Sequence, residues 1–299
     1  MKALVISGGG SKGAWAGGLI EYLSREKGME WDILIGTSTG SLLIPCIAIK
    51  AWDDVKHSYT TCSQHDIFSN CPFVVRREGD KVRAAFNHFS ILWQFLMRRK
   101  TLGESKRLRE LIGRTFTRDK WREMKASHKI IIVPVANLTT NRIEYKYARD
   151  YGYEEFCDWV WIACNMVPFM SLVVKNGIEY GDGGFGNPIP VQEAINLGAT
   201  EIDVVVLQPR HRALISPPST NAFVLLLKTY NFMQHQLSRD DISVSLAEAR
   251  HSGTKIRLIH TPEELTDNSF IFDPNQMTQW WRMGYEHSAK IYNEGFWKS

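Results

Sequence analysis

Long apolar runs are missing from this sequence of 299 residues, and no stretch approaches the ~20 residues that a transmembrane helix needs. The start lacks the apolar core of a signal peptide, because glycine follows after only four consecutive apolar residues. The five cysteines show neither a C-x-x-C pair nor a metal-ligand spacing with histidine, which favours a reducing compartment. We therefore expect a soluble, cytoplasmic protein without bound metal that contacts membranes at most peripherally.

Internal repeats, low-complexity tracts and long linkers are also absent, so one continuous domain over residues 1–299 is expected. Hydrophobic residues make up 44% of the chain, which suffices for a large core and excludes a disordered protein. The formal net charge of +4 is compatible with anionic surfaces but too small to indicate a nucleic-acid partner. Nothing in the sequence names a protein partner.

Buried strands are predicted by five short apolar runs, at residues 3–7, 32–35, 130–135, 202–207 and 256–259. Helical patterns separate most of these runs, for example Leu19, Tyr22 and Leu23 on one face of a first helix. Strands that alternate with helices predict a mainly parallel sheet covered on both faces.

Three further segments complete this outline of the fold. Residues 143–147 alternate apolar and polar side chains, which suits a half-exposed antiparallel edge strand. Residues 222–251 and 276–297 have helical patterns, and turns are predicted between them.

A glycine-rich loop follows the first predicted strand and leads into a helix, with the sequence Gly8, Gly9, Gly10, Ser11, Lys12 and Gly13. Its uncrowded amides at a helix N-terminus are typical of an anion site, for an oxyanion or a phosphate. The loop also matches the G-x-G-x-x-G pattern of dinucleotide-binding proteins, which requires an acid at the end of the second strand. Here Asp32 opens that strand instead, so a nucleotide-binding protein remains an alternative, as does a simple tight turn.

A second glycine motif, Gly36-Thr37-Ser38-Thr39-Gly40, lies between the second predicted strand and a helix. This strand-turn-helix placement is where a nucleophile elbow requires a strained serine flanked by glycines. Because the two loops follow consecutive parallel strands, we expect the amides of the first loop to lie near Ser38. A nucleophile beside preorganised donors is what acyl transfer needs.

The proton acceptor for Ser38 has two candidate types. An α/β-hydrolase would use a histidine after Asp182, and the chain has five there: His211, His235, His251, His260 and His287. None of them lies in a glycine-supported loop, so a Ser-His-Asp triad is the weaker alternative. The other candidate is Asp182 of Asp182-Gly183-Gly184, although Asp-Gly is also a strong hairpin signal.

Taken together, these three motifs resemble the patatin-like phospholipase family in order and content. The lead into the aspartate is similar too, and so is Gly284-Tyr285 in the last helix. The resemblance implies a three-layer α/β/α sandwich with a mainly parallel central sheet, and a serine lipid acyl hydrolase without metal or organic cofactor. Its implied substrates are the carboxylic esters of phospholipids or lysophospholipids.

The resemblance also assigns roles to single residues. It implies Ser38 as the nucleophile and Asp182 as the base of a Ser-Asp dyad that forms an acyl-serine intermediate. The oxyanion hole would come from the loop at Gly8, Gly9, Gly10 and Lys12, with Gly9 and Gly10 as the foremost donors. The supporting glycines are Gly13, Gly36, Gly40, Gly183 and Gly184. An ordinary aspartate is a poor base for serine, so we expect the pKa of Asp182 to be raised.

A basic and apolar segment at residues 72–100 stands outside these motifs. It holds seven basic and two acidic residues, the acids being Glu78 and Asp80. Within it, residues 91–97 are mostly apolar, and Arg98 follows them. We interpret the segment either as an interfacial helix or lid that meets lipid phosphates, or as a core helix with solvated ends.

Overall fold

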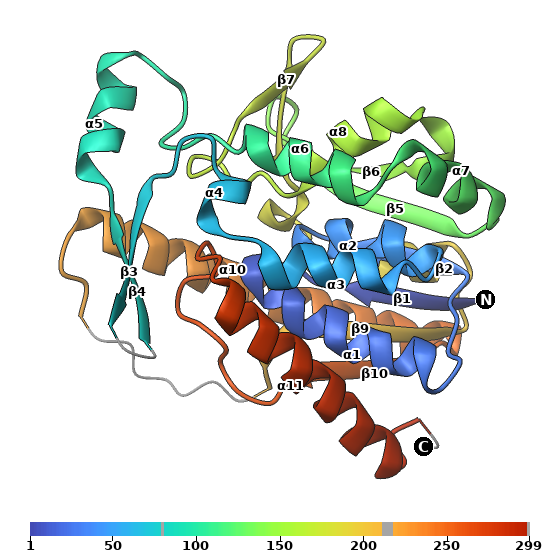
Figure 1. Cartoon of the computed structure of the whole chain (residues 1–299). Helices are drawn as coiled ribbons and strands as arrows, with labels where there is room; N and C mark the ends of the chain where they lie inside the picture. The colour runs from blue at the N-terminus through green and yellow to red at the C-terminus, as the bar shows by residue number, and fades with distance from the viewer. Residues whose placement is uncertain (79–80, 211–217, 298–299) are drawn as a thin grey trace.

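The computed structural model describes residues 1–78, 81–210 and 218–297, so Asp80 and His211 lie outside the described residues. A central eight-stranded sheet has the order β10-β9-β1-β2-β5-β8-β7, and β6 pairs with β5 beside this path (Figure 1). Its strands are β1 (Lys2–Ile6), β2 (Ile33–Gly36), β5 (Ile130–Asn137), β6 (Arg142–Tyr147), β7 (Val173–Lys175), β8 (Ile178–Asp182), β9 (Glu201–Pro209) and β10 (Lys255–Thr261).

The five apolar runs all form strands, and these five are parallel to one another. Successive side chains of β1 enter two different cores, with Leu4 and Ile6 on one face of the sheet and Ala3 and Val5 on the other. Burial on both faces explains why these strands read as continuous apolar runs.

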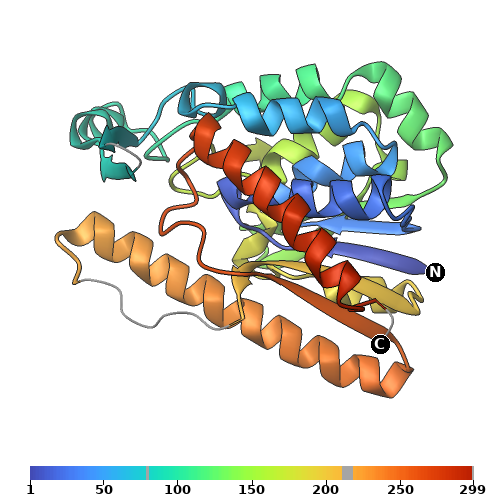
Figure 2. The same cartoon turned by 60° about the horizontal axis from the view of Figure 1, so that its bottom comes forward.

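Helices cover both faces of the sheet, which confirms the three-layer α/β/α sandwich (Figure 2). Of the helices in the described part of the chain, α9 (Val191–Asn196) and α10 (Ala222–Ser252) pack over one face. The opposite face carries α1 (Gly13–Arg25), α2 (Thr39–Ala48), α3 (Trp52–Thr61), α6 (Lys106–Thr115), α7 (Arg118–Ala126), α8 (Tyr153–Ala163) and α11 (Pro274–Asn293). The helices predicted over residues 222–251 and 276–297 correspond to α10 and α11.

Strand β5 brings the ends of two other strands together. Its residues 130–132 pair with β2, its residues 135–137 pair with β8, and β6 pairs along 132–137. Because a strand has two edges and β6 overlaps both of the other ranges, β2 and β8 must share the remaining edge. The chain leaves β2 at the loop that carries Ser38, and β8 enters from the opposite direction and ends at Asp182.

Two hairpins were not predicted from the sequence. Strands β7 and β8 are joined by Asn176 and Gly177, both with positive φ, which is the conformation of the tightest hairpin turns. Strands β3 (Phe73–Glu78) and β4 (Lys81–Phe86) form a separate antiparallel pair that leads into α5 (His88–Leu96). A short helix, α4 (Gln64–Ile67), precedes that pair. Asp182 itself ends β8 and starts a 3-10 turn, so the hairpin interpretation of Asp-Gly was wrong.

Candidate active site

Ser38 occupies the sharp turn between β2 and α2 in a strained backbone conformation, with φ of 51° and ψ of −122°. The turn is too tight for side chains at its flanking glycines. A Cβ on Gly36 would lie 2.3 Å from the carbonyl oxygen of Gly40, and one on Gly40 would lie 2.6 Å from that of Ile6. The strain holds the half-buried Ser38 side chain above the sheet edge, as in a nucleophile elbow.

Asp182 is fully buried, and its two carboxylate oxygens differ in their surroundings. Oδ1 accepts a hydrogen bond of 2.8 Å from the Gly184 amide, whereas Oδ2 has no hydrogen-bond partner. Burial raises the pKa of Asp182 to about 7, against the smaller lowering effects of the Ser38 hydroxyl and the Gly184 amide. A carboxyl group with this pKa can accept a proton near neutral pH.

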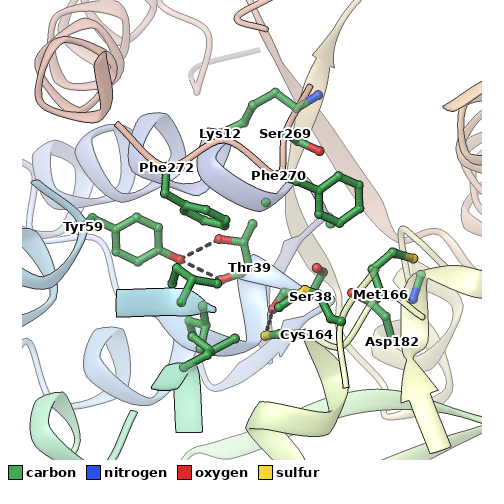
Figure 3. A pocket seen from close by; sticks show the side chains of 18 of the residues that line it. Lys12, Ser38, Thr39, Tyr59, Cys164, Met166, Asp182, Ser269, Phe270 and Phe272 are labelled. Atoms are coloured by element: carbon green, nitrogen blue, oxygen red, sulfur yellow. Dashed lines mark hydrogen bonds between the residues drawn. The ribbon is translucent and has the colours of Figure 1, made fainter. Parts of the chain in front are cut away.

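Ser38 and Asp182 lie side by side at the floor of a cavity (Figure 3). The Ser38 hydroxyl is close enough to stabilise the carboxylate, although no hydrogen bond of ordinary geometry joins the two side chains. Such bonds are often long or poorly aligned before substrate binds. The unpaired Oδ2 is therefore the acceptor toward which the hydroxyl can turn.

The glycine loop presents two backbone donors beside Ser38. No acceptor among the described residues pairs with the amides of Gly9 and Gly10. The amide of Gly8 instead lies 3.4 Å from the Pro188 carbonyl, and that of Lys12 donates to the Gly9 carbonyl at 3.1 Å. The Lys12 ammonium group lies 3.7 Å from Glu264. Gly9 and Gly10 are thus the loop members whose amides remain for an oxyanion.

Close packing explains why the loop carries glycine. Gly10 has a φ of +54°, and a Cβ there would lie 2.2 Å from the carbonyl oxygen of Ser269. A Cβ on Gly13 would lie 2.1 Å from the Thr39 hydroxyl, next to the nucleophile. Gly13 therefore sets how closely the loop approaches the elbow, and Gly10 sets how closely it approaches the segment before α11.

Sequence reasoning missed two side chains that support this arrangement. The buried Cys164 thiol donates to the Ser38 carbonyl at 3.0 Å, which braces the strained turn from below. On α10, Gln234 donates through Nε2 to the Gly184 carbonyl at 2.8 Å. Neither residue lies in a recognisable motif, so no local signal could have revealed it.

The cavity above these residues encloses about 1580 Å³, including the part open to solvent. Its apolar end extends among α2, α3, α6 and α8, and its polar end is formed by the glycine loop, α10 and residues 264–269. Apolar lining residues include Leu42, Val55, Ile67, Leu108, Leu111, Ile112, Phe116, Val160 and Met170. The arrangement suits a ligand with a long apolar part and a polar end beside Ser38.

The two alternative chemistries find little support in this geometry. None of the histidines in the described part of the chain lines the cavity that contains Ser38. Asp32 accepts from the Lys2 amide at the start of β1, at the opposite end of the sheet from the glycine loop, so it cannot contact a nucleotide bound at that loop. Within residues 1–78, 81–210 and 218–297, no cluster of three metal-ligating side chains is found.

Comparison with known proteins identifies a family with this fold. A family model of patatin-like phospholipases matches residues 4–195, a range that contains both Ser38 and Asp182. The fold is similar to the crystal structure of VipD from Legionella pneumophila, with a TM-score of 0.54 and 14% identity over 98% of this chain and 67% of that one. No curated protein matches the sequence significantly. The match over most of the chain shows that the protein belongs to the patatin-like phospholipase family, whose members hydrolyse lipid acyl esters.

Proposed function

We propose that the protein hydrolyses the carboxylic esters of phospholipids or lysophospholipids with a Ser38-Asp182 dyad. Membership of the family accounts for lipid ester hydrolysis in general. The observation that carries the finer proposal is the buried Asp182 carboxyl group, whose pKa is about 7 and whose Oδ2 lacks a partner next to a strained serine.

The first half of the reaction is acylation of Ser38. Asp182 Oδ2 takes the proton of the Ser38 hydroxyl while Oγ attacks the ester carbonyl carbon. The negative charge then develops on the former carbonyl oxygen, which the amides of Gly9 and Gly10 stabilise. When the tetrahedral intermediate collapses, the ester C–O bond breaks and the alcohol leaves with the proton held by Asp182.

The second half is hydrolysis of the acyl-serine. Asp182 removes a proton from water, the resulting hydroxide attacks the acyl carbon, and the same amides hold the oxyanion. Collapse releases the fatty acid and returns the proton from Asp182 to Ser38 Oγ. In both halves one carboxyl group serves first as base and then as acid, so a pKa near the working pH suits both roles.

The proposal is tested by kinetics with p-nitrophenyl esters and defined phospholipids, together with labelling by a fluorophosphonate. Wild-type protein should hydrolyse these esters and be labelled on Ser38. The variants Ser38→Ala and Asp182→Asn should each lose at least about a thousandfold in kcat. Cys164→Ser, which keeps a donor to the Ser38 carbonyl, serves as the matched control in the same pocket. Near-wild-type turnover by Asp182→Asn would rule out the dyad.

A further inference from the structure

Helix α5 exposes its apolar face instead of burying it. Phe89, Leu92, Trp93 and Leu96 follow the i, i+3, i+4, i+7 spacing of a single helix face, and all four are exposed. The polar Gln94 is buried on the other side at 7% exposure, whereas Phe89 is 81% exposed. The interpretation of this segment as a core helix was therefore wrong.

The first half of α10 exposes a second apolar stripe. Leu225 and Phe232 are seven residues apart, as are Leu226 and Met233, so the two pairs share one side of the helix. The helix begins beside α5, because the Phe223 ring lies 5.1 Å from that of Phe86 and 5.6 Å from that of His88. Both views show α5 and the start of α10 at the same end of the molecule (Figures 1 and 2).

The two stripes together form what we call the docking face: the exposed apolar side chains of α5 and of residues 225–233. Two such exposed apolar stripes on neighbouring helices are more than soluble monomers usually show unless the surface binds something. The face also borders the active site. The same part of α10 lines the cavity with Tyr230 and Gln234, and Gln234 bonds to Gly184 beside the base.

The two segments that carry the docking face hold charges of one sign. Residues 85–103 and 218–238, which hold α5 and the first half of α10, contain Arg98, Arg99, Lys100 and Lys228 but neither aspartate nor glutamate. Of these, Lys100 pairs at 2.7 Å with Glu179, which lies outside the two segments. Helices that lie in the interface of an anionic bilayer typically have an apolar face with tryptophan or phenylalanine, and basic residues at its edge. Both stripes of the docking face follow this pattern. No helix in the described part of the chain is long and apolar enough to cross one.

We propose that the docking face binds the surface of a bilayer that contains anionic phospholipids, with the apolar side chains inserted and the basic residues at the headgroups. The choice of a lipid surface over a protein partner rests on the proposed function. Bound in this way, the protein holds its cavity against the surface from which a lipid substrate must come.

The proposal is tested by sedimentation of the protein with phosphatidylcholine vesicles, prepared with or without phosphatidylglycerol. The double variants Phe89→Ser/Trp93→Ser and Leu225→Ser/Phe232→Ser should each weaken binding to the anionic vesicles by about tenfold or more. Arg98→Glu/Arg99→Glu should remove the preference for anionic vesicles, since each basic residue contributes about fivefold. Val244→Ser, at an exposed position on the far half of α10, and Arg122→Glu/Arg282→Glu are the matched controls and should bind normally.

Two results would overturn the proposal. One is wild-type vesicle binding by both apolar double variants. The other is a wild-type dimer that these variants convert to monomer while vesicle binding stays unchanged, which would make the face an interface between copies. Hydrolysis of water-soluble p-nitrophenyl butyrate checks that each variant is folded and active. If wild-type protein binds vesicles but hydrolyses no ester, the proposed function fails while the docking face stands.

Discussion

The Asp182 side chain is fully buried, and hydrogen bonds satisfy only one of its two carboxylate oxygens. Oδ2 has no partner, and burial is the largest influence on its pKa. The proposed catalysis requires the ionised form of this group, whereas folding favours its protonated form. Ionised Asp182 is the proposed base, yet ionisation of a buried, half-satisfied carboxyl group costs free energy.

The raised pKa predicts an acidic limit to activity. With a pKa of about 7, the fraction of Asp182 in the ionised form falls tenfold for each pH unit below that value. We expect kcat/KM for a short-chain ester to follow the same slope. A pH profile between 5 and 9 measures this, with circular dichroism to separate it from acid unfolding. A profile that stays flat down to pH 5 would show that another group is the base.

The same shift predicts that Asp182→Asn stabilises the fold. Because folding raises the pKa from 3.8 to about 7, the folded state binds the proton more tightly, and stability is lost as pH rises between those values. Each pKa unit corresponds to about 1.4 kcal/mol. The variant should therefore melt at a higher temperature than wild type at pH 8, with the difference shrinking toward pH 4. Calorimetry at both pH values tests the expectation.

The control is Asp203, a buried aspartate whose carboxylate oxygens both accept hydrogen bonds. Asp203 accepts from Trp31 at 2.8 Å and from Arg257 at 2.6 Å, so its carboxylate is well satisfied. Asp203→Asn should destabilise the protein at pH 8, because it removes one of the two carboxylates that pair with the buried Arg257 guanidinium group, the other being Glu201. Equal effects of the two substitutions would contradict the distinct environments of the two carboxyl groups.

At the scale of elements, α1 and α11 approach each other closely at two glycines. A Cβ on Gly18 would lie 1.8 Å from the Trp281 carbonyl oxygen, and one on Gly284 would lie 2.0 Å from that of Trp15. The helices therefore touch backbone to backbone at two glycines. The indole nitrogen of Trp281 also donates to the buried Glu21 at 2.7 Å.

Gly284→Ala should accordingly separate the two helices and lower the free energy of unfolding by about 2 kcal/mol or more. Gly113→Ala is the matched control, because its Cβ would meet no atom nearer than 3.6 Å on α6. That substitution should be neutral or stabilise the protein by about 0.5–1 kcal/mol. Urea unfolding of the two variants gives the comparison, and similar losses in both would show that the crossing is not tight.

The sequence predicted those elements that have a strong local pattern. The buried parallel strands and the elbow at Ser38 follow from apolar runs and glycine spacing that need no distant partner. The hairpin at Asn176 and Gly177 carried a usable signal, since Asn-Gly flanked by apolar residues is typical of such turns. Asp182 was harder to place, because its Asp-Gly pair has the same signal without being a hairpin.

Other features depend on contacts between distant residues and had no local signal. The support of the elbow by Cys164, the bond from Gln234 to Gly184 and the burial of Asp182 arise only when the end of α8, β8 and α10 reach the end of β2. Helix α5 was ambiguous for another reason. Its amphipathic spacing is the same whether the apolar face meets a core or the outside, so only the structure could decide.

At the scale of the whole molecule, the cavity connects the polar loops at the sheet edge with the helices of one layer. Leu111 of α6 lies in the apolar end, away from Ser38 and only partly buried. A larger side chain there should shorten the space for an acyl chain while leaving the catalytic residues unchanged.

Leu111→Trp should therefore lower kcat/KM for long-chain p-nitrophenyl esters by about tenfold and leave short-chain esters nearly unaffected. Leu138→Trp, at an exposed position outside the cavity, is the matched control. A chain-length series measured on both variants checks the expectation. Uniform loss across all chain lengths would indicate damage to the fold and not a shorter cavity.

Because β2 and β8 pair with the same edge of β5, the active site can form only at a defined stage of folding. Residues 130–132 hold the strand that leads to the nucleophile, and residues 135–137 hold the strand that ends at the base. Ser38 and Asp182 therefore meet only after β8 has paired, late along the chain. If Ser38 and Asp182 form the proposed dyad, a nascent or proteolytically opened protein has the serine without its acceptor and is inactive. Recovery of hydrolytic activity after dilution from denaturant would then time the docking of β8.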